Sequence, residues 1–237
     1  MIRFDHVTKQ YPGRVYALSD VTVSISDGEF VFLIGPSGAG KTTMLRLLIR
    51  DLLPTAGNIH VDAWHVNKLP VPNIHLLRRK VGTVFQDFKL LTDRTVFENV
   101  ALGLEILGKT DTEIATRVSD VLDLVGLGAK KNFFPLQLAA GEMQRTSIAR
   151  AIVGGPSILL ADEPTGNLDP ATSWEILDIL SEINKIGTTI IMATHNANIV
   201  NDFRKRTIGL NEGKLVSDEA RGRYPVKHAK EKHATHS

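Results

Sequence analysis

The segment GPSGAGKT at residues 35–42 carries three glycines, a lysine and a threonine at a fixed spacing. It fits the pattern G-x-x-x-x-G-K-[ST], the apolar run FVFLI precedes it, and a sequence with helical periodicity follows it. Glycine at these positions lets successive backbone N–H groups point inward at phosphate oxygens. Lys41 would reach the β- and γ-phosphates of a nucleotide, and the Thr42 hydroxyl would bind Mg²⁺. The segment therefore predicts a nucleotide site that comprises Gly35, Pro36, Ser37, Gly38, Ala39, Gly40, Lys41, Thr42 and Thr43.

Two adjacent carboxylates end a second apolar run, SILLADE at residues 157–163. Neighbouring carboxylates repel each other unless a cation lies close by, and a nucleotide-bound metal ion would be such a cation. Asp162 is therefore predicted to hold Mg²⁺ through water, and Glu163 to polarise an attacking water as a general base. About 120 residues separate Lys41 from this pair, far more than the dozen or so that a crossover between parallel strands needs.

The composition is that of a globular protein and excludes several kinds of chemistry. The chain has 237 residues, of which 43% are hydrophobic and 23% charged, and its net charge of +2 gives no support for a nucleic-acid partner. The absence of cysteine excludes disulfides, thiolate metal sites and cysteine nucleophiles. No segment resembles a signal peptide, and no apolar run approaches the roughly 20 residues of a membrane span. We expect a cytosolic protein whose membrane role, if any, passes through a partner.

The pattern along the chain alternates between β and α segments around a helical stretch. The first 35 residues predict strands, residues 42–53 predict a helix that Pro54 stops, and residues 88–155 read as helical. Thr110 and Glu113 form a capping-box pattern at the start of one helix in this stretch. The remaining expected elements are short strands near 58–62 and 81–85, a strand at 157–161, a helix at 170–186, a strand at 188–194 and another short helix. This is an α/β body with a helical insert.

The C-terminal residues 218–237 are basic and nearly free of apolar side chains, which predicts a disordered tail. Two roles remain open for it. The tail could only improve solubility, or it could attach to an anionic lipid surface, where each basic residue adds about 1 kcal/mol. The loose spacing of its histidines disfavours a metal site at His228, His233 and His236.

The order of these motifs resembles that of the ATP-binding-cassette (ABC) ATPases over nearly all of residues 1–217. The phosphate loop, the long gap with a helical insert, ILLADEPTGNLDP and a strand that ends in ATH carry the resemblance. It implies an α/β P-loop NTPase of ABC type, with a RecA-like core, an N-terminal antiparallel β-subdomain and a helical subdomain at about 88–155. It also implies ATP and Mg²⁺ as cofactors.

The resemblance extends to the segment LAAGE, which stands where the family has its signature LSGGQ or LSGGE. Leu138, Gly141 and Glu142 match the signature, whereas Ala139 replaces its serine and Ala140 its first glycine. In the family two copies stack head to tail, and this helix start contacts the γ-phosphate of ATP held by the other copy. Because Ala139 lacks the hydroxyl that donates to this phosphate, we expect weakened ATP-driven dimerisation and slow basal hydrolysis.

Four more residues receive roles from the resemblance alone. Tyr11 stands where an aromatic ring stacks on adenine, and Gln86 where a glutamine contacts Mg²⁺ and the attacking water. His195 stands where a histidine binds the γ-phosphate. Asp169 matches the acidic residue at the dimer seam, and it is also a good helix N-cap before Pro170, so both roles stay open.

Within the family, the segments FVFLIGPSGAGK, VFQDFKLL and LLADEPTGNLDP are most similar to the ATPases of bacterial cell division. These form homodimers at the cytoplasmic face of the inner membrane, held there by the integral membrane protein FtsX among other divisome proteins. FtsX is thought to activate cell-wall hydrolases instead of transporting a substrate. Phe88, Leu90 and Leu91 are candidate contacts of an FtsX-like helix, although they could equally be ordinary loop packing.

Three alternatives stay open at this point. The chain could serve a lipoprotein-release or peptide exporter, since those ATPases share most of these motifs. It could also be a scaffold that binds ATP with little hydrolysis, which the Ala139–Ala140 signature would permit. A soluble ABC ATPase that acts on DNA or ribosomes is disfavoured, because the chain has no second cassette, coiled coil or zinc module.

Overall fold

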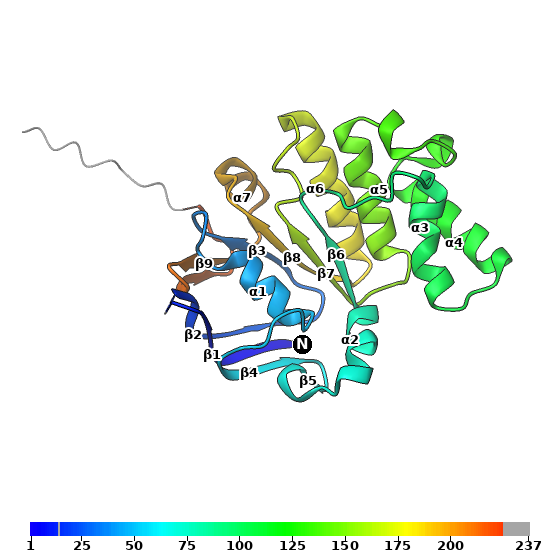
Figure 1. The fold of residues 1–237 in the computed structure, drawn as a ribbon. Helices are drawn as coiled ribbons and strands as arrows, with labels where there is room; N and C mark the ends of the chain where they lie inside the picture. Colours follow the sequence, from blue (N-terminus) through cyan, green and yellow to red (C-terminus); the bar gives the residue numbers. More distant parts are fainter. Residues whose placement is uncertain (14, 225–237) are drawn as a thin grey trace, which may run out of the picture.

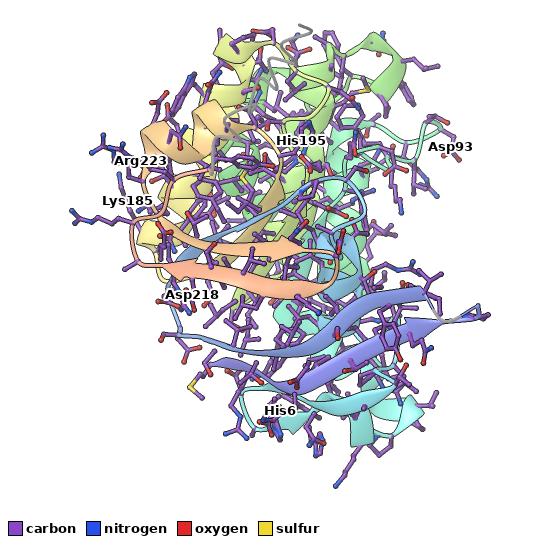
Figure 2. The ribbon with its side chains drawn as sticks, turned by 90° about the vertical axis from the view of Figure 1, so that its left-hand side faces the viewer. His6, Asp93, Lys185, His195, Asp218 and Arg223 are labelled. Atoms are coloured by element: carbon purple, nitrogen blue, oxygen red, sulfur yellow. The ribbon has the colours of Figure 1, made fainter. Side chains whose placement is uncertain are left out.

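The computed structural model describes residues 1–13 and 15–224, and within them the strands form two sheets (Figure 1). The antiparallel sheet has the strand order β2-β1-β4-β5. Its strands are β1 (Ile2–Tyr11), β2 (Val15–Ile25), β4 (Ala56–Val61) and β5 (Trp64–His65). It corresponds to the N-terminal antiparallel β-subdomain that the resemblance implies, and Figure 2 shows its His6 on the far side from His195.

The other sheet is mostly parallel and has the order β10-β9-β3-β8-β7-β6. Only β10 runs antiparallel to its neighbour among the strands of this sheet that the structure describes. Its strands are β3 (Phe30–Ile34), β6 (Val81–Val84), β7 (Ile158–Asp162), β8 (Thr189–Thr194), β9 (Arg206–Asn211) and β10 (Lys214–Glu219).

The central strand β3 explains why this sheet is buried on both faces. All five of its residues are buried, and Phe30 and Phe32 pack into one hydrophobic cluster while Val31 and Leu33 pack into another. Side chains of a strand alternate between faces, so a continuous apolar run is what a strand between two cores requires. Because β3, β6, β7 and β8 are parallel, their carboxyl ends meet at one edge of the sheet.

The helices flank this sheet. The helices α1 (Lys41–Leu48) and α2 (Ile74–Lys80) pack into the cluster that contains Val31 and Leu33. The helices α6 (Pro170–Lys185) and α7 (Ala197–Phe203) pack into the cluster that contains Phe30 and Phe32. A further group, drawn in green in Figure 1, lies to one side of the molecule and comprises α3 (Val96–Ile106), α4 (Asp111–Leu124) and α5 (Ala140–Ile152). These three helices lie within the predicted helical stretch. Among the described residues, no helix is both long and apolar enough to cross a bilayer.

The capping box predicted at Thr110 is confirmed. The Thr110 hydroxyl accepts the Glu113 N–H at 3.3 Å, and the Glu113 carboxylate accepts the Thr110 N–H at 2.9 Å. Lys109 adds an ion pair to the same carboxylate at 2.8 Å. The hydrogen bond from Lys109 is the largest cause that lowers the pKa of Glu113 from 4.5 to about 2, and the bonds from Thr110 follow.

This pKa predicts a pH-dependent contribution of Glu113 to stability. A carboxyl group whose pKa is depressed by folding stabilises the fold above its unfolded pKa, and this stabilisation is lost as pH falls toward the folded pKa. Glu113→Gln should therefore be less stable than the wild type at neutral pH, and the difference should shrink between pH 4.5 and about 2. Urea unfolding at several pH values measures it. Glu105→Gln, which removes an exposed carboxylate of α3, is the matched control variant in these experiments.

The structure differs from the sequence prediction at the end of α1. The predicted helix over 42–53 stops at Leu48, because Arg50 has a left-handed backbone with φ 55°. The N–H of Asp51 returns to the carbonyl of Arg46 at 3.0 Å, and the Arg50 side chain donates to the Val66 carbonyl at 3.0 Å. These backbone bonds form a local helix C-cap, which ends the helix before Pro54 does, and the contact with Val66 supports it.

The C-terminal strands were not anticipated either. Asp218 and Glu219, which the sequence assigned to the tail, lie in β10. The Arg206 guanidinium links Asp218 to Glu29 through ion pairs of 2.8 Å, which fixes the edge of the sheet. The structure also describes residues 220–224 of the predicted tail. Residues 225–237, among them His228, His233 and His236, lie outside the described residues, so the disorder expected there stays a prediction.

Candidate nucleotide site

The phosphate loop connects β3 to α1 and needs glycine at two of its positions for steric reasons. Gly35 and Gly40 have φ of 149° and 105°, a region that side chains rarely adopt. A Cβ on Gly35 would lie 2.2 Å from the Leu210 carbonyl oxygen, and one on Gly40 would lie 2.3 Å from that of Ala17. The loop is therefore held close to the neighbouring backbone, as a phosphate cradle requires.

Lys41 begins α1 and folds back over this loop. Its side chain is buried, and the ammonium group donates to the carbonyl oxygens of Gly35 at 2.8 Å and Pro36 at 3.3 Å. The same nitrogen lies 3.7 Å from a carboxylate oxygen of Glu163. The loop therefore presents one fixed positive charge to any anion that enters.

A cavity of about 580 Å³ opens above Lys41. This volume is within the usual range for a small-molecule site. The cavity brings together residues that follow the parallel strands β3, β6, β7 and β8. Its lining comprises Ala17, Pro36, Ser37, Gly38, Ala39, Gly40, Lys41, Thr42, Thr43, Gln86, Glu163, His195 and Tyr224.

Glu163 follows β7 directly and is held in a strained backbone conformation. Its φ of 51° costs about 1–3 kcal/mol for a residue with a side chain. The N–H of Glu163 donates to the Ala193 carbonyl at 2.9 Å, which ties it to β8. Such strain at the end of a buried strand is typical of functional residues, and here it aims a carboxylate into the cavity.

The Glu163 carboxylate lies between two basic groups. One oxygen is 2.9 Å from Nδ1 of His195 and accepts the His195 backbone N–H at 3.3 Å, while the other faces Lys41. His195, labelled in Figure 2, follows β8. Its side chain is mostly exposed, whereas that of Glu163 is 14% exposed. The arrangement can hold a water molecule on the carboxylate and a phosphoryl group against the two basic groups.

The three predicted metal ligands lie together beside this cavity. Thr42, Gln86 and Asp162 line a neighbouring cavity, and Thr42 and Gln86 also line the first one. One carboxylate oxygen of Asp162 is buried without a hydrogen-bond partner among the described residues. Burial, followed by the charge of Glu163, raises the pKa of Asp162 above its ordinary value. A buried carboxylate in need of a cation is the environment that a divalent ion would relieve.

The donor set fits Mg²⁺ bound together with a nucleotide. A hydroxyl, an amide and a carboxylate are oxygen ligands, and Mg²⁺ in nucleotide sites takes few protein ligands and completes its shell with phosphates and water. Among the described residues no group of three or more histidine, aspartate and glutamate side chains could hold a metal by itself. A metal ion held by these three residues would take its remaining ligands from a nucleotide and water.

The signature segment begins α5, on the side of the helical group. Ala139 precedes the helix without a side-chain cap, and its N–H donates to the Glu142 carboxylate at 3.0 Å. Glu142 also pairs with Lys130 at 2.5 Å, the largest cause that lowers the pKa of Glu142. Within the described residues, the N–H groups of Ala140 and Gly141 have no protein acceptor. Two donors at this helix start thus remain available.

Alanine at position 140 fits the helix without backbone strain. Ala140 is the first residue of α5 and has no positive φ. Gly141, by contrast, is required for packing, because a Cβ there would lie 2.4 Å from the Thr172 side chain of α6. The replacement of the first signature glycine by Ala140 therefore causes no strain in the local backbone.

Seven of the predicted site residues are not among those that line the cavity: Tyr11, Gly35, Ala139, Gly141, Glu142, Asp162 and Asp169. Asp169 caps α6, accepting the Thr172 N–H at 3.0 Å, so the capping role predicted from sequence is confirmed. Tyr11 ends β1, with Lys9 over its ring at 5.3 Å, and is not among the residues that line the cavity. Its stacking on adenine stays a prediction.

The cavity also includes two residues that the sequence did not single out. Ala17 reaches it from β2, and Tyr224 reaches it from the C-terminal segment. The N–H of Tyr224 donates to the Asn201 side chain at 2.9 Å, and burial, followed by the charge of Glu163, raises the pKa of its hydroxyl. No local pattern marks either residue, because both arrive through the tertiary fold.

Comparison with known proteins agrees with this geometry. The family model described as "ABC transporter" matches residues 18–166. The chain is 53% identical to a Mycobacterium tuberculosis protein and 51% identical to one from Bacillus subtilis, both over 94% of this chain and 98% of the relative. A protein from Escherichia coli is 47% identical over 91% of this chain and 97% of its own length. All three are named "Cell division ATP-binding protein FtsE".

Solved structures share the fold. The ATP-binding cassette MJ0796, in a dimeric post-hydrolysis state bound to ADP and phosphate, superposes with a TM-score of 0.85 at 35% identity, over 94% of this chain and 100% of the other. CbiO1 from Clostridium perfringens, part of an ABC transporter complex, gives a TM-score of 0.86 at 30% identity, over 92% of this chain and 88% of its own. The chain belongs to the ABC transporter family and is one of its ATP-hydrolysing cassettes.

Proposed function

We propose that this chain is the Mg²⁺-dependent ATPase subunit of an FtsEX-type cell-division system. The observation that carries the proposal is the meeting of Lys41, Glu163 and His195 in one cavity, in a chain 47–53% identical to proteins named FtsE. Under this proposal the folded cassette sits at the cytoplasmic face of the plasma membrane, held there by an FtsX-like integral membrane protein among other divisome proteins. Its movement would serve to activate cell-wall hydrolases.

The proposed reaction is attack of water on the γ-phosphate of ATP, with catalysis mainly by positioning and charge stabilisation. Glu163 would hold and polarise the water, because its carboxylate is fixed by His195 and by the strained turn after β7. Lys41 would neutralise charge on the β- and γ-phosphates, and His195 would contact the γ-phosphate. Thr42, Asp162 and Gln86 would hold Mg²⁺, which when bound neutralises phosphate charge.

Dimerisation on ATP would complete this site. The start of α5 in a second copy would lie over the γ-phosphate, with the free N–H groups of Ala140 and Gly141 and the helix dipole directed at it. Asp169 would lie at the seam between the two copies as well as capping α6. Tyr11 would stack on the adenine from the antiparallel sheet.

A groove beside Gln86 would receive the membrane partner. It is part of the cavity of about 980 Å³ that Thr42, Gln86 and Asp162 also line, and it extends between α1 and the loop after β6 to Arg46, Ile49, Phe85 and Lys89. The neighbouring Leu91 is 42% exposed, whereas Phe88 and Leu90 are half-buried. We therefore assign the direct partner contact to Leu91, and to Phe88 and Leu90 the packing of the loop.

The test of this function is ATP turnover by the chain reconstituted in lipid with an FtsX-like integral membrane protein. A four-span protein with an external domain that stimulates turnover supports the proposal. Turnover that depends on a transported lipoprotein or peptide would instead favour the exporter alternative. Tight ATP binding without turnover under any of these conditions would favour a scaffold.

We expect Ala139→Ser to strengthen the ATP-bound dimer and to raise turnover. The added hydroxyl would donate to the γ-phosphate of the other copy, and a hydrogen bond to a charged group contributes about 1.5–3 kcal/mol, or about 10- to 150-fold. Analytical ultracentrifugation with ATP and steady-state turnover measure the two effects. Ala139→Gly removes the methyl without adding a donor, and it should leave both values near those of the wild type. Equal affinity and turnover in Ala139→Ser would contradict the prediction.

A further inference from the structure

The loop that follows Gln86 contains two consecutive residues in an unfavourable conformation. Phe88 and Lys89 have φ of 55° and 50°. Non-glycine residues rarely adopt this left-handed region, and usually only as single residues. Such a conformation persists only where the surrounding structure holds it. Side chains of α5 and α3 hold the loop in this conformation.

Arg150 on α5 provides the restraint. Its guanidinium donates to the carbonyl oxygen of Lys89 at 2.6 Å and to that of Phe88 at 2.8 Å. The two strained residues thus present both carbonyls to one planar fork, which is the geometry that arginine recognises better than lysine. Arg150 is half-buried, so these bonds are partly shielded from competing water.

A second tether attaches the far end of the loop to the same group of helices. The buried Asn99 of α3 accepts the Leu91 N–H at 2.8 Å and donates to the Leu91 and Arg94 carbonyls at 3.0 and 3.1 Å. The loop is therefore held by α3 and α5 from Phe88 onward, while Gln86 itself lines the nucleotide cavity. Arg150 holds the part of the loop nearer to Gln86, because the Phe88 carbonyl that it binds lies two residues after Gln86 in the chain.

Arg150 also lies ten residues along α5 from the helix start at Ala140, about 15 Å at the rise of an α-helix. One rigid helix therefore joins the signature segment at its start to the loop of Gln86 near its end. Resting on the proposed function, we propose that Arg150 is a positioning residue that couples these two places. When the start of α5 engages the nucleotide of the second copy, Arg150 transmits the displacement to Gln86 in its own chain.

The chain offers a matched control for this proposal. Arg117 of α4 also donates from its side chain to a backbone carbonyl, that of Val153 at 3.2 Å, just beyond the end of α5. It supports the same helix but does not touch the loop after Gln86. Arg117→Met and Arg150→Met each remove an arginine that donates to a backbone carbonyl. Only Arg150→Met also removes the proposed connection to the loop after Gln86.

The test uses the full chain with MgATP and a double-mutant cycle with Gln86→Ala. We expect Arg150→Met to lower kcat about tenfold with ATP affinity unchanged within about twofold, and Arg150→Lys, with a single donor group, to lie between it and the wild type. Because Arg150 acts through Gln86, the double variant should be no slower than Gln86→Ala alone. Arg117→Met should keep the wild-type kcat.

Amide hydrogen exchange over residues 85–91 gives a readout that does not depend on turnover. Exchange should rise in Arg150→Met, rise less in Arg150→Lys, and stay at the wild-type rate in Arg117→Met. Losses in kcat that multiply in the double variant, or an equal effect of Arg117→Met, would overturn the proposal. If Arg150→Met does not fold, the same comparisons are made with Arg150→Lys.

Failure of the proposed function can be distinguished from failure of the Arg150 proposal. A wild-type chain that binds ATP but does not hydrolyse it, alone or with its partner, would reject both. Multiplicative losses in an active chain would reject only the role of Arg150.

Discussion

Glu163→Gln should reduce ATP turnover by about 10²- to 10⁴-fold, the range that general-base catalysis usually contributes. The substitution keeps the size of the side chain and an oxygen that can face His195, but it removes the negative charge that polarises water. ATP should bind as tightly as before or more tightly, because a carboxylate 3.7 Å from Lys41 is lost from the phosphate site. Steady-state hydrolysis and equilibrium binding of ATP measure the two effects separately.

The same substitution gives a second readout that concerns the dimer. If ATP bridges two copies and hydrolysis releases them, Glu163→Gln should accumulate an ATP-bound dimer in size-exclusion chromatography. Glu182→Gln, a matched change on the exposed surface of α6 where Glu182 pairs with Lys185, should alter neither turnover nor dimerisation. Turnover of Glu163→Gln within about threefold of the wild type would remove Glu163 from the mechanism.

Lys41→Met should weaken ATP binding by about 10- to 150-fold, which is the effect of losing one charged hydrogen bond worth about 1.5–3 kcal/mol. Methionine has a similar length but carries no charge, and it leaves the carbonyls of Gly35 and Pro36 without the donor they now have. Hydrolysis should fall further than binding, because the charge on the γ-phosphate increases as water attacks. Titration calorimetry and turnover at saturating ATP measure these two losses.

Lys185→Met is the matched control, since Lys185 lies on the exposed surface of α6, as Figure 2 shows. It removes one positive charge and should leave the affinity for ATP unchanged within about twofold. Thermal unfolding without nucleotide separates loss of the site from loss of the fold. ATP affinity in Lys41→Met equal to that of the wild type would show that Lys41 does not bind phosphate.

Features set by short stretches of chain were predictable from the sequence. The phosphate loop is one, because its glycines and Lys41 act within eight residues and their backbone angles follow from residue type. The capping box at Thr110 is another, because its donors and acceptors lie three residues apart. The run FVFLI indicated a strand buried on both faces before any neighbouring strand was known.

The roles of Gln86, His195 and the signature helix needed the resemblance to a family. A glutamine or histidine after a strand has no local pattern that marks it as functional. The structure places Gln86 and His195 in the same cavity as Lys41 and Glu163 because their strands are parallel neighbours. Their catalytic roles remain predictions that the variants above address.

The sequence by itself determined the chemistry that the chain can offer, since residue type and short spacing decide which groups bind phosphate, cap helices and fill strands. Only the tertiary structure decided which residues of the C-terminal segment join the cavity and what holds the loop after Gln86. Tyr224 and Arg150 each act through partners at least 23 residues away in the chain. Contacts over such separations depend on how the sheets and helices pack, and no local pattern encodes them.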